Sequence, residues 1–392
     1  MKDRSRPPTS AELEQVALAN QSGGPPVVFV HGLWLLASSW DPWRAMFEAA
    51  GYSTVVPGWP DDPPTVEGGW RHPELFAGKS VGDITEHFVQ VIKGLDTKVA
   101  IIGHSFGGLI TQKLAGRGLA RVSVPIDPGP FRGVLPLPFS SLKAASAVLR
   151  NPANKKRSVM LTYDQFRYAF ANAVDEAEAK RLYDTFPVPG SGVPLFQAAF
   201  ANLNPSTEAQ VDSKNPARGP MKLISGEKDH TVPWAIANAS FKRQRRIKSV
   251  TEIEEVDDRG HSLVIDSGWE EVARVAKSFV DRFVLSWRQV SVGVELGPKD
   301  HNHDRENNWR DHGANPRDGD EKEDVLRQQA AWPGVLNPQE EVVRQVPAPE
   351  GDQKRAQTTT PILGRDERDT GQHDDRRGLA GDFNVTDAVI DD

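Results

Sequence analysis

Short apolar segments and longer amphipathic segments alternate along residues 24–288 of the chain. The apolar runs occupy residues 27–30, 53–56, 99–102, 122–126, 221–224 and 250–256. Most of them show no polar alternation, which is typical of strands covered on both faces. Helical patterns lie between them, at residues 40–50, 81–95, 106–116, 233–243 and 269–287. This alternation predicts an α/β fold with a mostly parallel sheet of about six strands flanked by helices.

One interval is too long for a simple crossover between two parallel strands. Residues 131–218 separate two strand candidates, whereas a single crossover helix needs far fewer residues. Helical patterns fill this interval at residues 140–149, 163–171, 176–186 and 195–201. We therefore predict a helical cap of residues 131–215 over the strand ends, inserted into a core formed by residues 24–130 and 216–288.

The two ends of the chain differ in composition from this core. Residues 1–23 are charged and contain proline, and we expect a flexible segment with one or two turns of helix near residues 11–19. Residues 289–392 hold 23 Asp and Glu against 13 Lys and Arg, a net charge of −10. Such a segment cannot bury enough apolar surface to offset its ordering entropy, so an acidic, disordered tail is predicted. Its histidines lie in a solvated charged run and predict no metal site.

Composition excludes several classes of protein. Residues 1–288 carry 34 basic and 31 acidic side chains, so neither part has the concentrated positive charge that nucleic-acid binding needs. The absence of cysteine excludes disulfides and thiolate metal sites. The N-terminus has no apolar stretch of signal-peptide length, and no run of about 18 apolar residues could span a membrane. We expect a cytoplasmic protein.

The strongest chemical signal is the sequence Gly-His-Ser-Phe-Gly-Gly at residues 103–108, with Ser105 at its centre. It follows an apolar run directly and opens a helical pattern. A serine in such a sharp strand-to-helix turn exposes its hydroxyl at the carboxyl end of the strand, and glycines on either side relieve the crowding of the turn. This context predicts a nucleophilic serine rather than an ordinary glycine-rich turn.

A serine hydroxyl needs a base and a group that orients the base. Asp229 and His261 each follow a predicted strand, so both loops lie at the same edge of a parallel sheet as Ser105. The chain order serine, acid, histidine is the order expected for this kind of turn. We predict Ser105, Asp229 and His261 as a catalytic triad. Asp127, at another strand end, is the alternative acid, and His230 is the weaker candidate for the base.

The predicted reaction also needs two donors for a developing oxyanion. The backbone N–H of Phe106, which follows the nucleophile, is one candidate. The second comes from the loop after residues 27–30, where Leu33 is the first choice and Trp34 the other.

The substrate pocket is expected to be apolar. Trp34 lies in a loop at the edge of the predicted triad, and Leu135, Leu137 and Phe139 begin the predicted cap. We predict these four residues as substrate contacts. Nothing in the sequence calls for a metal ion or an organic cofactor.

With these residues in place, the chain resembles the α/β-hydrolase superfamily, serine-nucleophile branch, from about residue 25 to residue 287. The matching pieces are the His-Gly at residues 31–32, the turn around Ser105, and the loops of Asp229 and His261. Finer details, such as the sequences at residues 31–34, 57–60 and 126–130, are similar to a bacterial, esterase-like group. The resemblance implies a sheet of eight strands with a helical cap, and here the chain is too short before residue 27 for the first two strands.

Three functions remain open at this point. The first is hydrolysis of an ester or related acyl bond of a hydrophobic small molecule, with water as the second substrate. The second is the chemistry of a cofactor-free perhydrolase or a carbon–carbon bond hydrolase, which uses the same triad; a serine nucleophile argues against the epoxide and haloalkane branches. The third is ligand binding without catalysis on the hydrolase fold.

Overall fold

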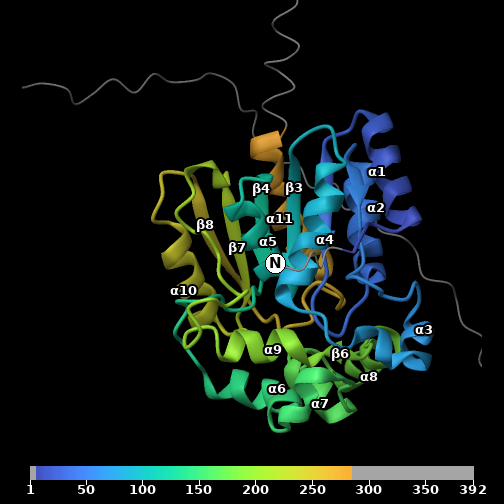
Figure 1. The fold of residues 1–392 in the computed structure, drawn as a ribbon, viewed down its shortest axis with the longest axis vertical. Helices are drawn as coiled ribbons and strands as arrows, with labels where there is room; N and C mark the ends of the chain where they lie inside the picture. The colour runs from blue at the N-terminus through green and yellow to red at the C-terminus, as the bar shows by residue number, and fades with distance from the viewer. Residues whose placement is uncertain (1–5, 285–392) are drawn as a thin grey trace, which may run out of the picture. The chain divides into compact units, whose positions relative to one another are not determined.

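The computed structural model describes residues 6–284, and the predicted acidic tail of residues 289–392 lies outside the described residues. A single parallel sheet of six strands forms the centre of the described part (Figure 1). The strand order is β2-β1-β3-β4-β7-β8, and every neighbouring pair is parallel. These are β1 (Pro26–Val30), β2 (Ser53–Val55), β3 (Val99–His104), β4 (Ala120–Ile126), β7 (Met221–Gly226) and β8 (Thr251–Val256). The predicted α/β architecture of about six parallel strands is confirmed.

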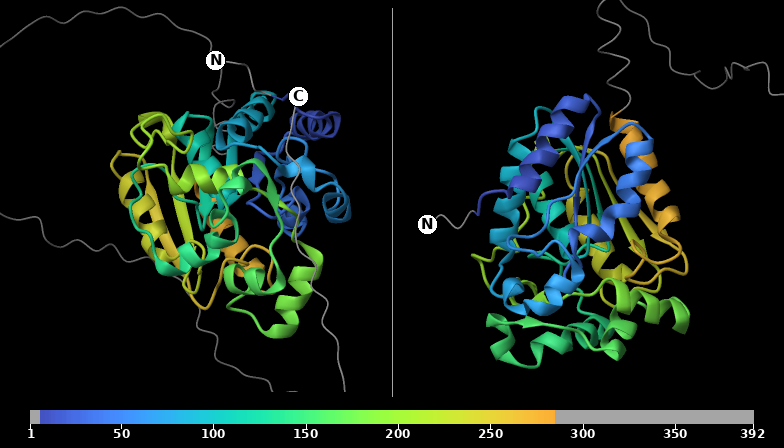
Figure 2. Two further views of the ribbon diagram at one scale, coloured as in Figure 1. Left: turned by 60° about the horizontal axis from the view of Figure 1, so that its bottom comes forward. Right: turned by 90° about the vertical axis from the view of Figure 1, so that its right-hand side faces the viewer.

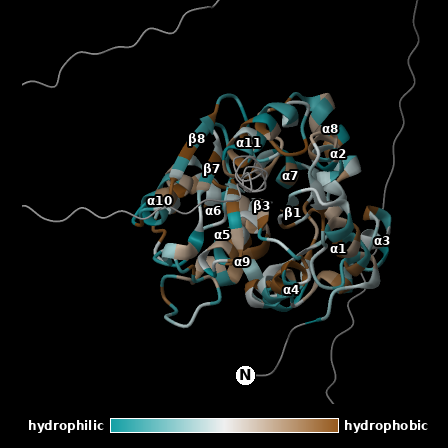
Figure 3. Ribbon diagram, turned by 90° about the horizontal axis from the view of Figure 1, so that it is seen from above, coloured by the Kyte–Doolittle hydropathy of each residue, from teal (hydrophilic) through white to brown (hydrophobic). Residues whose placement is uncertain are grey.

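Helices cover both faces of this sheet, which explains why its central strands are apolar throughout. All residues of β1 and β3 are buried. Helices α1, α4 and α5 pack together on one side, and α2 and α11 meet on the other (Figure 2). The helices of the core are α1 (Ser10–Ser22), α2 (Asp41–Ala49), α3 (Val66–Arg71), α4 (Val81–Lys93), α5 (Phe106–Gly116), α10 (Trp234–Gln244) and α11 (Trp269–Val284). Helices that cover the sheet, such as α4, carry both hydrophilic and hydrophobic residues, because only one side of each helix faces the core (Figure 3).

The N-terminal helix corrects the expectation of a flexible segment over residues 1–23. Helix α1 spans thirteen residues and begins at a capping box formed by Thr9 and Glu12. Val16 and Ala19 belong to the main hydrophobic core, and the Glu12 carboxylate lies 3.0 Å from Nε2 of His87 in α4. The sequence conceals this docking because Leu13 and Leu18, its largest apolar side chains, point outward.

Between β4 and β7 the chain forms a set of short helices at the carboxyl ends of the strands (Figure 1). We call residues 131–215 the cap segment. Within it, the short strands β5 (Ser158–Val159) and β6 (Gly190–Ser191) form an antiparallel pair. Its helices are α6 (Phe139–Leu149), α7 (Tyr163–Ala169), α8 (Glu176–Thr185) and α9 (Gly192–Ala199), with a 3-10 turn at Pro152–Lys156.

The outer strand β8 differs from the central strands because one of its sides meets water. Glu252 and Glu254 alternate with Ile253, and Lys222 of β7 lies 2.6 Å from the Glu254 carboxylate. Charges along an edge strand discourage pairing with another chain. In the described residues, no helix is long and apolar enough to cross a membrane.

Candidate active site

Ser105 occupies a strained turn between β3 and α5. Its backbone has φ +56° and ψ −121°, a region that residues with side chains rarely adopt. Three backbone hydrogen bonds hold the turn: Ser105 N–H donates to Ile126 O at 2.9 Å, and Ser105 O accepts from Leu109 and Gly129. Strain of this kind persists only where the surroundings fix it, and here it presents the hydroxyl at the carboxyl edge of the sheet.

Glycines next to the turn are required by close packing. A Cβ at Gly107 would lie 2.6 Å from His31 O, and a Cβ at Gly103 would lie 2.7 Å from the carbonyl carbon of Gly107. A Cβ at Gly32 would lie 2.8 Å from Ser105 Cβ, so the loop after β1 runs directly beside the serine. Real Cβ atoms do not approach this closely, and any side chain here would displace the turn.

His261 and Asp229 reach Ser105 from the loops after β8 and β7. His261 Nε2 lies 3.0 Å from Ser105 Oγ, and His261 Nδ1 lies 2.6 Å from Asp229 Oδ2. The other oxygen, Asp229 Oδ1, accepts hydrogen bonds from the backbone N–H groups of Thr231 and Val232 at 2.6 and 2.9 Å. All three predicted side chains are therefore buried in one continuous hydrogen-bonded chain, with the carboxylate fixed from behind.

The alternative acid, Asp127, lies beside this chain but is not hydrogen-bonded to the histidine. Its Oδ2 is 3.9 Å from His261 Nδ1 and has no hydrogen-bond partner among the described residues. Its Oδ1 accepts from Gly226 N–H at 2.8 Å. Complete burial, together with the neighbouring Asp229 carboxylate, raises the pKa of Asp127 well above its ordinary value. The structure thus places one carboxylate against the imidazole and a second acid, with a raised pKa, next to it.

Two other histidines near the site have different surroundings. Burial and the nearby His261 lower the pKa of His104 well below its ordinary value, so its ring stays neutral. That ring packs against His261 with 4.6 Å between centroids. His230, the weaker candidate for the base, instead contacts Tyr168, whose carbonyl lies 3.0 Å from its Nδ1.

The two predicted oxyanion donors lie on either side of Ser105. Phe106 is the first residue of α5, and Leu33 is a buried residue in the loop that Gly32 places against the serine. Within residues 6–284, neither backbone N–H donates a hydrogen bond to a protein acceptor. A buried N–H without a partner is uncommon, because leaving it unpaired costs free energy, so both are available to a ligand.

A buried charged network, which the sequence did not reveal, supports the loop of Leu33. Trp59 stacks on His31 with 5.2 Å between centroids, and its indole N–H donates to His31 O. His31 Nε2 lies 3.2 Å from Asp62 Oδ2, and Lys79 Nζ lies 2.7 Å from Asp62 Oδ1. Burial opposes the charge of Asp62, but His31 and Lys79 outweigh it and hold the pKa of Asp62 below its ordinary value. The network thus holds His31, two residues before Leu33, in place.

An apolar cavity of about 200 Å³ opens at Ser105, between the core and the cap segment. Three of the four residues predicted as substrate contacts, Trp34, Leu135 and Leu137, line it. The fourth predicted contact, Phe139, is not among the residues that line the cavity: its side chain is 80 % exposed, because α6 turns it outward. That any of the four contacts a substrate stays a prediction.

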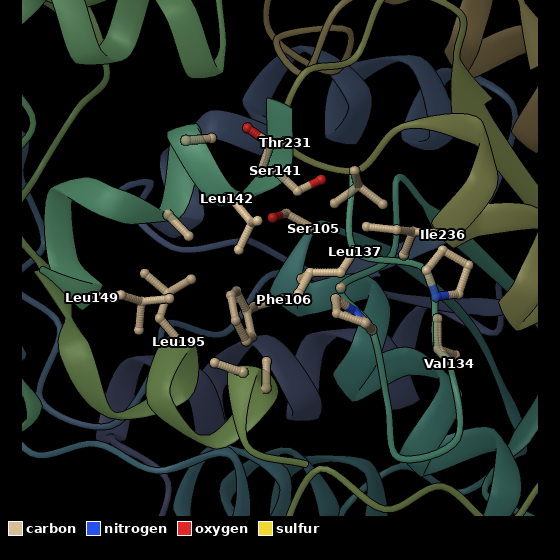
Figure 4. Close-up of a pocket in the computed structure, with 18 of the residues that line it drawn as sticks. Ser105, Phe106, Val134, Leu137, Ser141, Leu142, Leu149, Leu195, Thr231 and Ile236 are labelled. Atoms are coloured by element: carbon tan, nitrogen blue, oxygen red, sulfur yellow. The ribbon is translucent and has the colours of Figure 1, made fainter. Parts of the chain in front are cut away.

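The cavity is lined mainly by residues that the sequence did not identify. Figure 4 shows Leu137 and Leu142 near Ser105, with Leu149 and Leu195 farther along the wall. On α6 the lining residues recur every three or four positions, which marks an inward face that periodicity alone could have suggested. The lining residues outside the predicted set include Phe131, Val134, Ser141, Leu142, Ala144, Ala145, Leu149, Leu195, Ala198, Ala199, Thr231, Val232 and Ile236.

One group of described residues has the side chains that could hold a metal ion. The ligand atoms of His104, Asp127 and His261 lie within 4.8 Å of one another. His261 already uses both nitrogens, toward Asp229 and Ser105, so an ion there would break the hydrogen bond to the serine. The expectation that the protein needs no metal or cofactor stays a prediction.

Comparison with known proteins places the chain among related folds. Residues 27–275 match the model of the alpha/beta hydrolase family. No curated protein sequence matches the chain. Among solved structures, a monoacylglycerol lipase from Paleococcus ferrophilus is similar at 20% identity and a TM-score of 0.48, covering 66% of this chain and 96% of that one. A thermophilic esterase from Thermogutta terrifontis is similar at 15% identity and a TM-score of 0.48, covering 67% of this chain and 91% of that one. An extracellular alpha/beta-hydrolase from a Paenibacillus species matches at 17% identity and a TM-score of 0.46, covering 65% and 98%.

Proposed function

The chain belongs to the alpha/beta hydrolase family and is a hydrolase, and from this premise we propose that it cleaves an ester or related acyl bond of a hydrophobic small molecule. The observation that carries the proposal is the hydrogen-bonded chain from Ser105 Oγ through His261 to Asp229, which ends at an apolar cavity. A nucleophile, a base and an orienting carboxylate with this connectivity are the parts that acyl transfer through a serine needs.

In the first half of the proposed reaction, Ser105 Oγ attacks the acyl carbonyl carbon while its proton passes to His261 Nε2. The Nδ1–H of the new imidazolium donates a hydrogen bond to Asp229 Oδ2 across 2.6 Å, and the negative charge of the carboxylate stabilises the imidazolium. The carbonyl oxygen takes up negative charge and accepts from the free N–H groups of Phe106 and Leu33. Collapse of this intermediate moves the His261 proton to the leaving oxygen and leaves an ester between the acyl group and Ser105.

In the second half, water attacks the acyl-enzyme and gives a proton to His261 Nε2. Collapse of the second tetrahedral intermediate releases the carboxylic acid and returns the proton to Ser105 Oγ, which regenerates the free enzyme. The acyl group is proposed to lie along the wall formed by Leu137, Leu142 and Leu195 (Figure 4). This wall carries no charge, and an apolar acyl chain therefore fits it better than a charged one.

The proposal is tested with p-nitrophenyl and phenyl esters that share one acyl group. If a Ser105 acyl-enzyme forms and its hydrolysis limits the rate, both esters give the same kcat, and added methanol diverts a constant fraction of product to the methyl ester. Ser105→Ala is the control and is expected to abolish turnover. Ester cleavage that survives Ser105→Ala, or no cleavage over a series of acyl lengths by the folded wild type, would contradict the proposal.

A further inference from the structure

The outward face of helix α6 combines large apolar and basic side chains. Phe139, Lys143 and the C-cap residue Arg150 are spaced by four and seven residues, which places them on one side of the helix, and Leu142 lies at the boundary between this side and the side that lines the cavity. The exposed fraction is 80 % for Phe139 and 42 % for Leu142, and both basic residues are exposed. The opposite side of the helix carries Ala144 and Val148, among others, and is buried. The helix thus presents hydrophobic side chains to the outside of the molecule.

The apolar surface extends beyond this helix to the mouth of the cavity. Leu135 and Leu137, in the loop before α6, are 72 % and 66 % exposed and also line the cavity. Phe200 and Leu203 follow α9 and are likewise exposed. Asn202, which lies between them in the chain, donates to Val134 O and joins this turn to the same loop. Clustered exposed apolar side chains at a cavity mouth mark a site of interaction.

The charged side chains of the segment that carries most of this apolar surface have one sign. Residues 131–160 contain six basic residues and no Asp or Glu, and all six are exposed. None of them forms an ion pair with another residue in the described part of the chain, although Lys143 lies over the ring of Tyr168. The neighbouring α8 differs, because its Asp184 and Glu178 are paired with Lys180 and Arg181. The six basic residues are Arg132, Lys143, Arg150, Lys155, Lys156 and Arg157.

We propose that residues 131–160 dock this protein on an anionic lipid surface. Apolar side chains that enter the interface, flanked by unpaired Lys and Arg, are the two features that hold a peripheral helix on such a surface. The unpaired positive charge favours negatively charged lipid over a neutral apolar partner. If the proposed acyl-ester function holds, which this part of the inference requires, the substrate is a lipid-soluble ester that passes from the membrane between Leu137 and Leu142 to Ser105.

The experiment is sedimentation of the full chain with two kinds of vesicle. One is an equimolar mixture of phosphatidylglycerol and phosphatidylcholine, and the other is phosphatidylcholine alone. The wild type is expected to bind the anionic vesicles and to be released by added salt, because screening weakens the charge term. Lys143→Glu with Arg150→Glu is expected to weaken binding by about tenfold or more.

A matched control makes the same change of charge at a place far from this surface. Arg246 and Lys248 are exposed and precede β8, at the sheet edge opposite the carboxyl ends, so Arg246→Glu with Lys248→Glu is expected to leave vesicle binding unchanged. Thermal melting checks that both double variants are folded. Hydrolysis of a small water-soluble ester is expected to be equal in the wild type and in Lys143→Glu/Arg150→Glu.

Three results would overturn the docking proposal: no preference for anionic vesicles, equal loss in the two double variants, or a wild-type dimer that Phe139→Ser converts to a monomer. The last result would assign the surface to a second copy of the chain. Binding to anionic vesicles by a protein that cleaves no ester would leave the docking intact and would reject the proposed function instead.

Discussion

Replacing Asp229 by asparagine separates the roles of the two buried acids near His261. The backbone N–H groups of Thr231 and Val232 donate to Asp229 Oδ1, so the carbonyl oxygen of an asparagine must stay there. Its NH₂ group then faces His261 Nδ1 and donates to it. The imidazole is forced into the tautomer that carries its proton on Nε2, and it can no longer accept the proton of Ser105.

The expected loss is about 10⁴-fold in kcat/KM, or about 5.5 kcal/mol of transition-state stabilisation, since the base is present but wrongly protonated. Asp127→Asn is the matched comparison. Burial raises the pKa of Asp127 well above its ordinary value, and its Oδ2 has no hydrogen-bond partner among the described residues, so an amide of the same shape removes no hydrogen bond to His261. For this variant the expected change is within about tenfold.

Both rates are measured as kcat/KM on the best ester found and as the second-order rate of Ser105 labelling by a fluorophosphonate. The labelling rate needs no known substrate and reports the activation of the serine alone. Melting temperatures check that both variants are folded. A larger loss in Asp127→Asn than in Asp229→Asn would refute the assignment and make Asp127 the partner of His261.

Three further predictions follow from single contacts. Burial lowers the pKa of His104, so the unfolded chain binds a proton below pH 6.5 that the folded chain does not. The free energy of unfolding is therefore expected to fall on acidification by up to about 1.4 kcal/mol per pH unit. Thermal melts from pH 7.5 to 5.5 are expected to show a smaller fall for His104→Gln than for the wild type. An unchanged slope would contradict this. Ala198→Phe fills the cavity and is expected to lower kcat/KM for an octanoyl ester at least about tenfold more than for an acetyl ester; equal losses would place the acyl group elsewhere. Asp62→Asn leaves the Lys79 ammonium buried without its partner and is expected to cost about 3 kcal/mol in urea unfolding, whereas no loss would mean that the pair does not support the loop.

The sequence predicted the elements whose signals are local. Helix α5 has the predicted bounds, because the turn at Ser105 and the glycines around it fix where the helix begins. The central strands β1 and β3 were predictable because both of their faces are buried, which makes their apolar runs continuous. The juxtaposition of Ser105, Asp229 and His261 was predictable for a topological reason, since parallel strands bring the loops at their carboxyl ends together.

Features that depend on distant contacts were not predictable in the same way. Helix α1 docks through only two small apolar side chains, too few to give a periodic signal. Phe139 was chosen for its closeness in sequence to the predicted cap, whereas the side of α6 that lines the cavity follows from the spacing of Ser141, Ala145 and Leu149. The network of His31, Asp62 and Lys79 joins three separate loops, and no spacing rule connects them.

The most direct test of the central claim is the intact mass of the protein after treatment with a fluorophosphonate. The account predicts one adduct on the wild type, located on Ser105 by peptide mapping, and none on Ser105→Ala. His261→Ala, which keeps the serine but removes its base, is expected to label far more slowly than the wild type. An unlabelled wild type that is demonstrably folded, or an adduct that persists in Ser105→Ala, would contradict the claim that Ser105 is an activated nucleophile.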